Sequence, residues 1–300
     1  DTLIIDFIGS QRNGMTYSIL AGTVSSVENL VILDNRYNSL HMPADVWMGF
    51  DSIQMSQPNN WYWEGIRLRI DGSGESISFD NMTQGSYANY VDLQGEFDVI
   101  DLTSNPVNFP ADGWWEPGRV NVNATFSSLI GSGIADRIYL NRSAQVDVKT
   151  GVGDDIIYLN TAGFSGVIDG GDGSDTVDVR NAGLTDFTNI ALTNIESIYH
   201  GGSSVIVTAE QRDAISFDGS GRVYVLENGV VTGTDEADSY SGNGFGVFEG
   251  GAGNDSISNV TTAVFTGNQA DYDWDRNGSS LTIQHSRGTL LDGTDTLNGV

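Results

Sequence analysis

Two short stretches of the sequence combine glycines with an aspartate in an order that suits the binding of a hard cation. GGDGSDTVD runs from 170 to 178, and GGAGNDSIS runs from 250 to 258. Glycines let the backbone turn through positive φ, so that carbonyl oxygens can face a bound ion. The aspartate adds an anionic oxygen, and the aliphatic residue two places later points into a core. Both stretches therefore predict a glycine-rich turn that holds a cation.

Calcium is the cation that we expect such turns to hold. It takes roughly six to eight oxygen ligands in flexible geometry, whereas magnesium demands octahedral geometry and keeps its water. One turn offers too few oxygens, but two turns stacked at the strand spacing of about 4.8 Å can share one ion. The sequence therefore predicts stacked turns with calcium between successive coils.

Five aspartates recur at spacings that suit a stack of coils. They are Asp136, Asp155, Asp175, Asp238 and Asp255. The spacings are 19 and 20 residues in the first group and 17 in the second, and DGTDTLNGV at 292–300 is a last echo. A coil of this length holds two short strands and two turns, and it buries its aliphatic face only by stacking on its neighbours. We therefore expect an all-β fold built around a parallel β-roll, a β-solenoid, with arrays at 121–182 and 233–260.

The two complete stretches resemble the nonapeptide G-G-x-G-x-D-x-U-x, which is the calcium-binding repeat of RTX (haemolysin-type) proteins. The segment Phe265–Tyr272, followed by 292–297, looks like the one that often trails RTX arrays. Leu192–Ile198 resembles the N-I-E-x-I strand of RTX-type bacterial surface-layer proteins and adhesins. The resemblance implies export by a type I system, calcium-triggered folding outside the cell and a structural role.

The resemblance carries over to fourteen candidate calcium-binding positions. They are Asp136, Gly151, Gly153, Asp155, Gly170, Gly171, Asp172, Gly173, Asp175, Asp238, Gly250, Gly251, Gly253 and Asp255. The incomplete repeats replace motif glycines, with Thr150 in one, Ser132 and Ile134 in another, and Thr234 and Glu236 in a third. We expect these departures to weaken ion binding at the array edges. The alternative for each aspartate is a turn residue that caps backbone groups, and it stays open above all for Asp136 and Asp238.

The charge of the chain restricts its partners. The 300 residues include 40 acidic and 13 basic side chains, which gives a formal charge of −27. Such a surface repels nucleic acid and anionic lipid, attracts divalent cations and opposes compaction in their absence. The sequence has no cysteine, which excludes disulfides and thiol catalysis. No run approaches about 18 apolar residues, so we expect no transmembrane segment.

The elements that would position these turns are short strands. Alternating runs such as IRLRI at 66–70 and DVIDL at 98–102 read as β, and Thr208–Ile215 is the best candidate for a helix. A weaker repeat pairs Val27–Leu30 with Ile195–Ile198, each followed by a strand and a short helix or turn. Composition divides the chain into four regions. They are a strand-rich region with Trp-bearing loops at 1–120, the first array at 121–182, an inserted β segment at 183–232, and the second array with a trailing β segment at 233–300.

Other functions rest on weaker patterns. Trp61 and Trp63, like Trp114 and Trp115, lie beside a glutamate and could stack on sugar rings, although core filling or a protein contact is the favoured explanation. The sequence has three histidines but no HExxH, no G-x-S-x-G elbow and no Walker loop. We therefore expect no enzyme activity.

The function we expect is structural. The chain would form part of an extracellular bacterial surface layer or fibre that assembles from copies of itself and is folded by calcium. Cell-surface polysaccharide is a further partner to consider. The alternatives are an RTX adhesin that binds glycan through its tryptophan loops, and the secretion domain of an exported enzyme.

Overall fold

The structure is a computed structural model that describes ten stretches of the chain. They are residues 1–6, 16–20, 26–33, 39–56, 67–82, 90–104, 119–142, 145–242, 246–288 and 292–300. Within them the fold is all-β, with mainly parallel pairing and only two short α-helices. The chain divides into two compact units, of which unit 1 comprises 1–182 and 190–198, and unit 2 comprises 183–189 and 199–300. The fold prediction is confirmed at this level.

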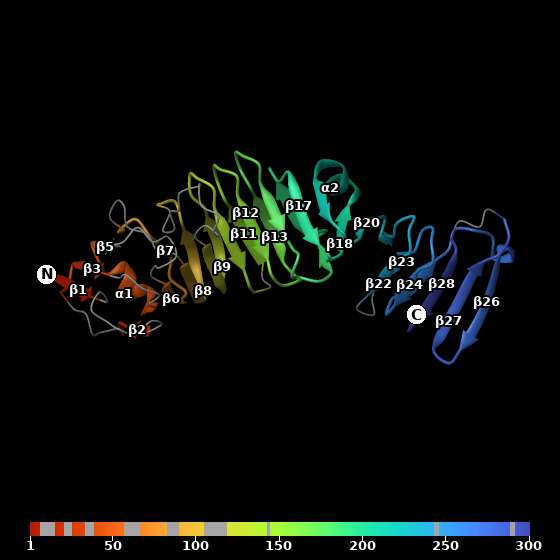
Figure 1. Cartoon of the computed structure of the whole chain (residues 1–300), viewed down its shortest axis with the longest axis horizontal. Coiled ribbons are helices and arrows are strands. Elements are labelled where there is room, and N and C mark those ends of the chain that lie inside the picture. Colours follow the sequence, from red (N-terminus) through yellow and green to blue (C-terminus); the bar gives the residue numbers. More distant parts are fainter. Residues whose placement is uncertain are drawn as a thin grey trace. The chain divides into compact units, whose positions relative to one another are not determined.

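Unit 1 consists of parallel strands that lie side by side (Figure 1). Its elements are β1 (Thr2–Asp6), β2 (Thr16–Ser18), β3 (Asn29–Leu33), β4 (Ser39–Pro43), α1 (Ala44–Met48), β5 (Ser52–Ser56), β6 (Arg67–Ser73), β7 (Ile77–Ser78), β8 (Tyr90–Asp101), β9 (Arg119–Ile130), β10 (Arg137–Leu140), β11 (Gln145–Lys149), β12 (Ile156–Leu159), β13 (Ser165–Asp169), β14 (Thr176–Asp178) and β16 (Ile190–Thr193). β17 (Ser197–Gly201) begins in this unit.

Two parallel ladders diverge from the long strand β9. One continues through β10, β12 and β14, and the other continues through β11, β13 and β16. Each coil of chain therefore gives one strand to each ladder. The expected region boundary at residue 120 falls inside β9, whose pairing with β8 runs from Tyr90↔Arg119 to Asp101↔Ile130.

Alternation of side chains along these strands builds the core of unit 1. Leu140 pairs in register with Leu159, and both are buried. Tyr139 and Tyr158 point to the opposite face, where their rings stack at 4.0 Å. Because every second side chain of a strand faces the same way, the aliphatic residues form continuous rows from coil to coil, as the repeat predicts.

Unit 2 contains a six-stranded and a five-stranded sheet. Its elements are β15 (Thr185–Asp186), β18 (Val205–Thr208), α2 (Ala209–Ala214), β19 (Ser216–Gly219), β20 (Val223–Glu227), β21 (Val230–Thr232), β22 (Ser239–Ser241), β23 (Val247–Glu249), β24 (Ser256–Ser258), β25 (Thr262–Val264), η1 (Gln269–Asp271), β26 (Tyr272–Asn277), β27 (Ser280–His285) and β28 (Thr294–Asn298). The sheet orders are β15-β18-β20-β21-β23-β25 and β22-β24-β28-β27-β26. β28 pairs in parallel with β24, so the last echo of the repeat adds a further strand to the second array.

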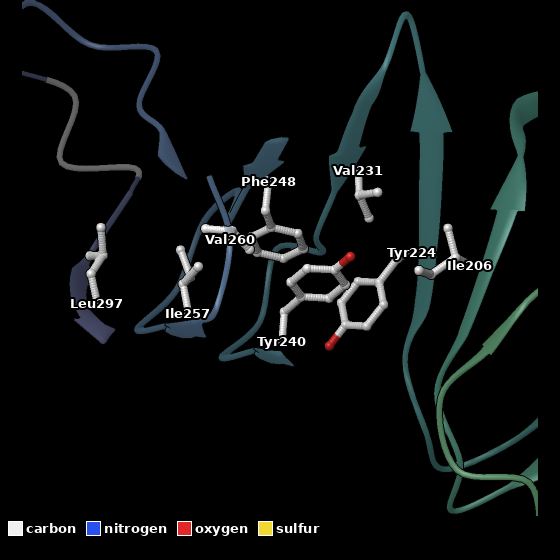
Figure 2. Packing of buried hydrophobic residues seen from close by; sticks show 8 residues of the cluster. All are labelled: Ile206, Tyr224, Val231, Tyr240, Phe248, Ile257, Val260 and Leu297. Atoms are coloured by element: carbon white, nitrogen blue, oxygen red, sulfur yellow. The ribbon is translucent and has the colours of Figure 1, made fainter. Parts of the chain in front are cut away.

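Aromatic rings fill the middle of the unit 2 core (Figure 2). Tyr240 and Phe248 stack with their centroids 4.2 Å apart, and Tyr224 meets both rings edge-on. Ile257 and Leu297 extend the core along β24 and β28. Stacked and edge-on pairs are the geometries that aromatic rings prefer, which explains how large side chains fit between short strands.

The weaker repeat recurs as an order of elements. β3, β4, α1 and β5 follow one another in the first copy, and β17, β18, α2 and β19 follow one another in the second. The predicted helix is confirmed as α2, which begins with a capping box. Thr208 accepts a hydrogen bond from the Gln211 N–H at 3.1 Å, and Gln211 Oε1 accepts one from the Thr208 N–H at 3.0 Å.

Replacing Thr208 by alanine is expected to destabilise unit 2 by about 1 kcal/mol, because the first turn of α2 loses the acceptor for one of its free N–H groups. Chemical denaturation of the wild type, of Thr208→Ala and of Thr208→Ser measures this loss. Serine keeps the oxygen and should retain most of the stability. An alanine variant as stable as the wild type would show that the cap contributes nothing.

Candidate metal centre

The predicted aspartates lie at equivalent places in successive coils. Asp136, Asp155 and Asp175 each come directly before a strand of one ladder, namely β10, β12 and β14. Asp238 and Asp255 stand in the same way before β22 and β24. All five are buried, and Asp155 and Asp175 are fully so. The parallel register of the strands therefore stacks the aspartates into two rows.

Hydrogen bonds connect neighbours in the first row. The Asp136 N–H donates to Asp155 Oδ1 at 2.7 Å, and the Asp155 N–H donates to Asp175 Oδ1 at 2.8 Å. The Asp175 N–H donates in turn to Glu196 Oε2 at 2.7 Å. One carboxylate oxygen of each residue thus caps a backbone N–H of the preceding coil.

The second row repeats this arrangement. The Asp238 N–H donates to Asp255 Oδ1 at 2.9 Å, and the Asp255 N–H donates to Asp295 Oδ1 at 2.8 Å. We call the two rows the carboxylate ladders, comprising Asp136, Asp155, Asp175 and Glu196 in unit 1 and Asp238, Asp255 and Asp295 in unit 2. Glu196 and Asp295 complete the ladders without being among the predicted positions. Their sequence signal is an acidic residue two places before a buried aliphatic residue, as in E-S-I and D-T-L.

The second carboxylate oxygen separates the repeats that keep the second motif glycine from those that replace it. Asp175 Oδ2 and Asp255 Oδ2 are buried and accept no hydrogen bond from the described residues, and Asp155 Oδ2 is in the same state. Buried carboxylate oxygens are costly without a donor or a cation. These oxygens are consequently the points at which a proton or a cation would offset the cost of burial.

Asp136 and Asp238 instead find donors within their own turns. Asp136 Oδ2 accepts from the Ser132 N–H at 2.6 Å, and its Oδ1 accepts from the Ser132 hydroxyl at 3.0 Å. Asp238 Oδ2 accepts from the Thr234 N–H at 2.6 Å and from the Thr234 hydroxyl at 3.1 Å. The residues that replace the second motif glycine therefore satisfy the carboxylate themselves.

Asp238 also forms an ion pair with the guanidinium group of Arg222. Arg222 Nε lies 3.2 Å from Asp238 Oδ1, and Arg222 Nη1 lies 2.6 Å from Glu236 Oε2. These ion pairs raise the pKa of Arg222, with the hydrogen bond to Glu236 as the largest cause. Arg222 thus places a permanent positive charge at the first rung of the second ladder.

The turns approach one another so closely that side chains would not fit. Gly171 has φ +91° and Gly173 has φ +151°, and a Cβ on either would overlap the backbone oxygen of Gly151 or Gly153 in the neighbouring turn. The same left-handed conformation occurs at Gly151, Gly153, Gly251 and Gly253. Direct hydrogen bonds tie the turns together, including Asp172 N–H to Gly151 O at 2.8 Å. Asp172 itself is exposed to solvent. The structure therefore does not bring this predicted calcium-binding residue into either row of aspartates.

The first glycine of each complete repeat borders the free oxygen. A Cβ on Gly170 would meet both Asp175 Oδ2 and the carbonyl oxygen of Asn194, and a Cβ on Gly250 would meet Asp255 Oδ2. Carboxylate and carbonyl oxygens thus face the same space beside Gly170. Oxygens of these two kinds are the ligands that calcium takes in proteins.

Burial makes the ladder carboxylates reluctant to ionise. It raises the pKa of Asp136 and of Asp255 to about 6 and that of Asp295 to about 7. Burial also raises the pKa of Asp175, and the nearby carboxylates of Glu196 and Asp154 raise it further. Desolvation disfavours the charged form unless a cation compensates it. The ladders are therefore places where a cation or a proton gains free energy by binding.

The side-chain arrangement differs from a compact metal cage. In the stretches that the structure describes, no three His, Asp or Glu side chains gather into a group that could hold a metal. A calcium site here would need backbone carbonyls and water as well as carboxylates. Trp61, Trp63, Trp114 and Trp115 lie outside the described residues, so the sugar-binding prediction stays a prediction.

Comparisons with known proteins give no neighbour for this chain. No family model, no curated protein and no solved structure matches it. Among the described residues, no helix has the length and apolar character to cross a bilayer. The functional argument therefore rests on the ladders and on the surfaces of the two units.

Proposed function

We propose that this chain is a structural protein of the bacterial cell exterior whose parallel coils form calcium-stapled β-rolls. The observation that carries the proposal is the pair of buried, unpartnered oxygens, Asp175 Oδ2 and Asp255 Oδ2. Both belong to the complete glycine-rich repeats. In both, the first glycine packs so closely against this oxygen that a Cβ would overlap it.

The residues that would hold calcium follow from the hydrogen bonds. Asp155, Asp175 and Asp255 each have an oxygen left for an ion, whereas Ser132, Thr234 and Arg222 already satisfy Asp136 and Asp238. The glycines of the adjoining turns would add carbonyl oxygens. Bound calcium supplies two positive charges between coils, and it offsets part of the self-repulsion of a chain with net charge −27.

Self-association is the second part of the proposal. In the described sheets, β26 and β22 are the end strands of one sheet and β25 is an end strand of another. Open strand edges of this kind accept a strand from a further chain. Copies stacking edge to edge would produce a fibre or a surface layer, with cell-surface polysaccharide as an anchoring partner.

The proposal is tested by titrating calcium into the metal-free protein while circular dichroism and light scattering are recorded, with magnesium as the control ion. We expect a calcium-specific gain of β structure and thermal stability, followed by growth in scattering. Stabilisation follows RT ln(1 + [L]/Kd) for each site. An unchanged stability across the titration would contradict the calcium assignment.

The scattering signal separates the proposed function from its alternatives. Calcium-dependent folding without growth in scattering would contradict self-assembly and leave the adhesin or the secretion domain of an enzyme. A chain that is fully folded and equally stable without calcium would reduce the glycine-rich stretches to plain turns.

A further inference from the structure

The C-terminal hairpin of unit 2 carries an aromatic pocket whose lining contains none of the ladder residues. β26 and β27 lie side by side as an antiparallel pair (Figure 1). In this pair Trp274 is opposite Ile283. Tyr272 lies two residues before Trp274 and therefore on the same face of β26. The pocket measures about 330 Å³ and is lined by Phe265, Gly267, Gln269, Tyr272, Trp274 and Ile283. This volume lies at the lower end of the range for small-molecule sites.

Trp274 is unusually exposed for its size. It is 74% exposed, the highest fraction among the exposed large apolar side chains of the described stretches. The indole contributes little to the core, whereas Tyr272 and Phe265 in the same lining meet edge-on at 5.6 Å. A large aromatic side chain that is exposed to water beside a pocket marks a place where a bound ligand can cover apolar surface.

A buried carboxylate lies directly behind the pocket. The Tyr272 hydroxyl donates a hydrogen bond to Asp292 Oδ2 and accepts one from the Gly267 N–H at 2.9 Å. His285 also contacts Asp292, with its Nδ1 lying 3.5 Å from Oδ2. Burial and the bond to Asp292 raise the pKa of Tyr272 to about 12, so the phenol stays neutral. A phenol that donates to a carboxylate keeps an electron-rich ring face.

The surrounding charges favour a cationic ligand. The chain has a net charge of −27, and the Asp292 carboxylate accepts a hydrogen bond from the Tyr272 hydroxyl in the pocket lining. Arg287 lies beside Tyr272 but its charge is paired, because its Nη2 binds Asp273 Oδ1 at 2.7 Å. It also binds the Tyr272 carbonyl at 3.2 Å and the Ala270 carbonyl at 2.7 Å. An anionic ligand would be repelled, while the field attracts a positive one.

The lining distinguishes between kinds of cation. None of the six lining residues is charged, so an ammonium that needs strong acceptors would lose hydration without replacement. A quaternary ammonium group donates no hydrogen bonds and binds through the faces of aromatic rings. We propose that this pocket binds a trimethylammonium group by cation–π contact with Trp274, Tyr272 and Phe265. The proposal uses none of the carboxylate oxygens to which calcium is assigned.

Isothermal titration calorimetry of the full chain in calcium buffer tests the pocket with choline as the probe. The matched control ligand is 3,3-dimethylbutan-1-ol, which has the same shape without the charge. We expect saturable binding of choline and at least about fivefold weaker binding of the neutral isostere, the effect of roughly one cation–π contact. Glucose serves as the neutral sugar control.

Two variants assign the binding to the pocket. Trp274→Ala should weaken choline binding by about fivefold or more without changing the thermal midpoint, since the side chain is mostly in water. Trp274→Tyr should retain most of the affinity. Ile4→Ala, which removes an exposed apolar side chain in unit 1, should leave binding unchanged.

Vesicles of phosphatidylcholine distinguish whether the trimethylammonium group belongs to a lipid headgroup or to a free solute. Cosedimentation that is lost in Trp274→Ala would assign a lipid headgroup, and choline binding without cosedimentation would assign a free solute. Equal binding of choline and its neutral isostere, binding of glucose alone, or no saturable choline binding would each overturn the proposal.

Discussion

Replacing both Asp175 and Asp255 by asparagine is expected to abolish most of the stabilisation by calcium while leaving the metal-free protein folded. Asparagine keeps the oxygen that accepts the N–H of the preceding coil. It replaces the unpartnered Oδ2 by a neutral amide nitrogen, which cannot bind a cation. At a calcium concentration of about 100 Kd, each lost site removes about 2.7 kcal/mol, so the double variant should lose about 5 kcal/mol.

The metal-free double variant should be at least as stable as the metal-free wild type. Each substitution removes a buried charge whose desolvation opposes folding. In the first ladder the new amide faces the carbonyl oxygen of Asn194, which borders the same space as Asp175 Oδ2. Chemical denaturation with and without calcium measures the two effects, which have opposite signs.

Asp136 and Asp238 provide the matched control in the same ladders. Their carboxylates are satisfied by Ser132, Thr234 and Arg222, so Asp136→Asn together with Asp238→Asn should leave the calcium-dependent stabilisation unchanged. A normal calcium response in the Asp175/Asp255 variant would refute the assignment of the ions. An equal loss in both double variants would show that the ladder binds calcium as a whole rather than at the free oxygens.

The repeat could be predicted from the sequence because its signal is local. The same pattern, glycines followed by an aspartate and an aliphatic residue, recurs at the length of one coil. The spacing between Asp136, Asp155 and Asp175 in the sequence therefore predicts that they lie in register. The helix α2 was predictable for the same reason, since Thr208 and Gln211 form its cap within four residues.

The partners of the carboxylates could not be predicted in this way. Arg222 precedes Asp238 by sixteen positions and reaches it only through the packing of β20 against its neighbours. Asp295 joins Asp255 from forty residues away because the β26–β27 hairpin is inserted between their strands. In Asp155, Asp175 and Asp255 one carboxylate oxygen accepts a backbone N–H and the other has no partner. This difference depends on the distances between the folded turns, which cannot be deduced from the residue types.

Lowering the pH of the calcium-free protein from 8 to 5 is expected to stabilise it. Burial holds the pKa of Asp295 at about 7 and that of Asp136 and Asp255 at about 6, whereas 3.8 is the ordinary value in the unfolded chain. The folded state therefore binds protons that the unfolded state releases in this range. Stability from these groups is complete below pH 3.8 and is lost as the pH rises through 6 and 7. Between pH 5 and 8, Asp295 alone accounts for a change of roughly 3 kcal/mol.

Calcium should weaken this dependence, because an ion binds only the ionised carboxylates and its affinity falls as they take up protons. Unfolding free energies measured between pH 5 and 8 should fall with rising pH in the absence of calcium and fall less steeply in its presence. Asp295→Asn resembles the protonated ladder, so it should flatten the calcium-free curve and raise its value at pH 8. Parallel curves with and without calcium would mean that protons and calcium do not compete at the ladders, and the ion would then have to bind elsewhere.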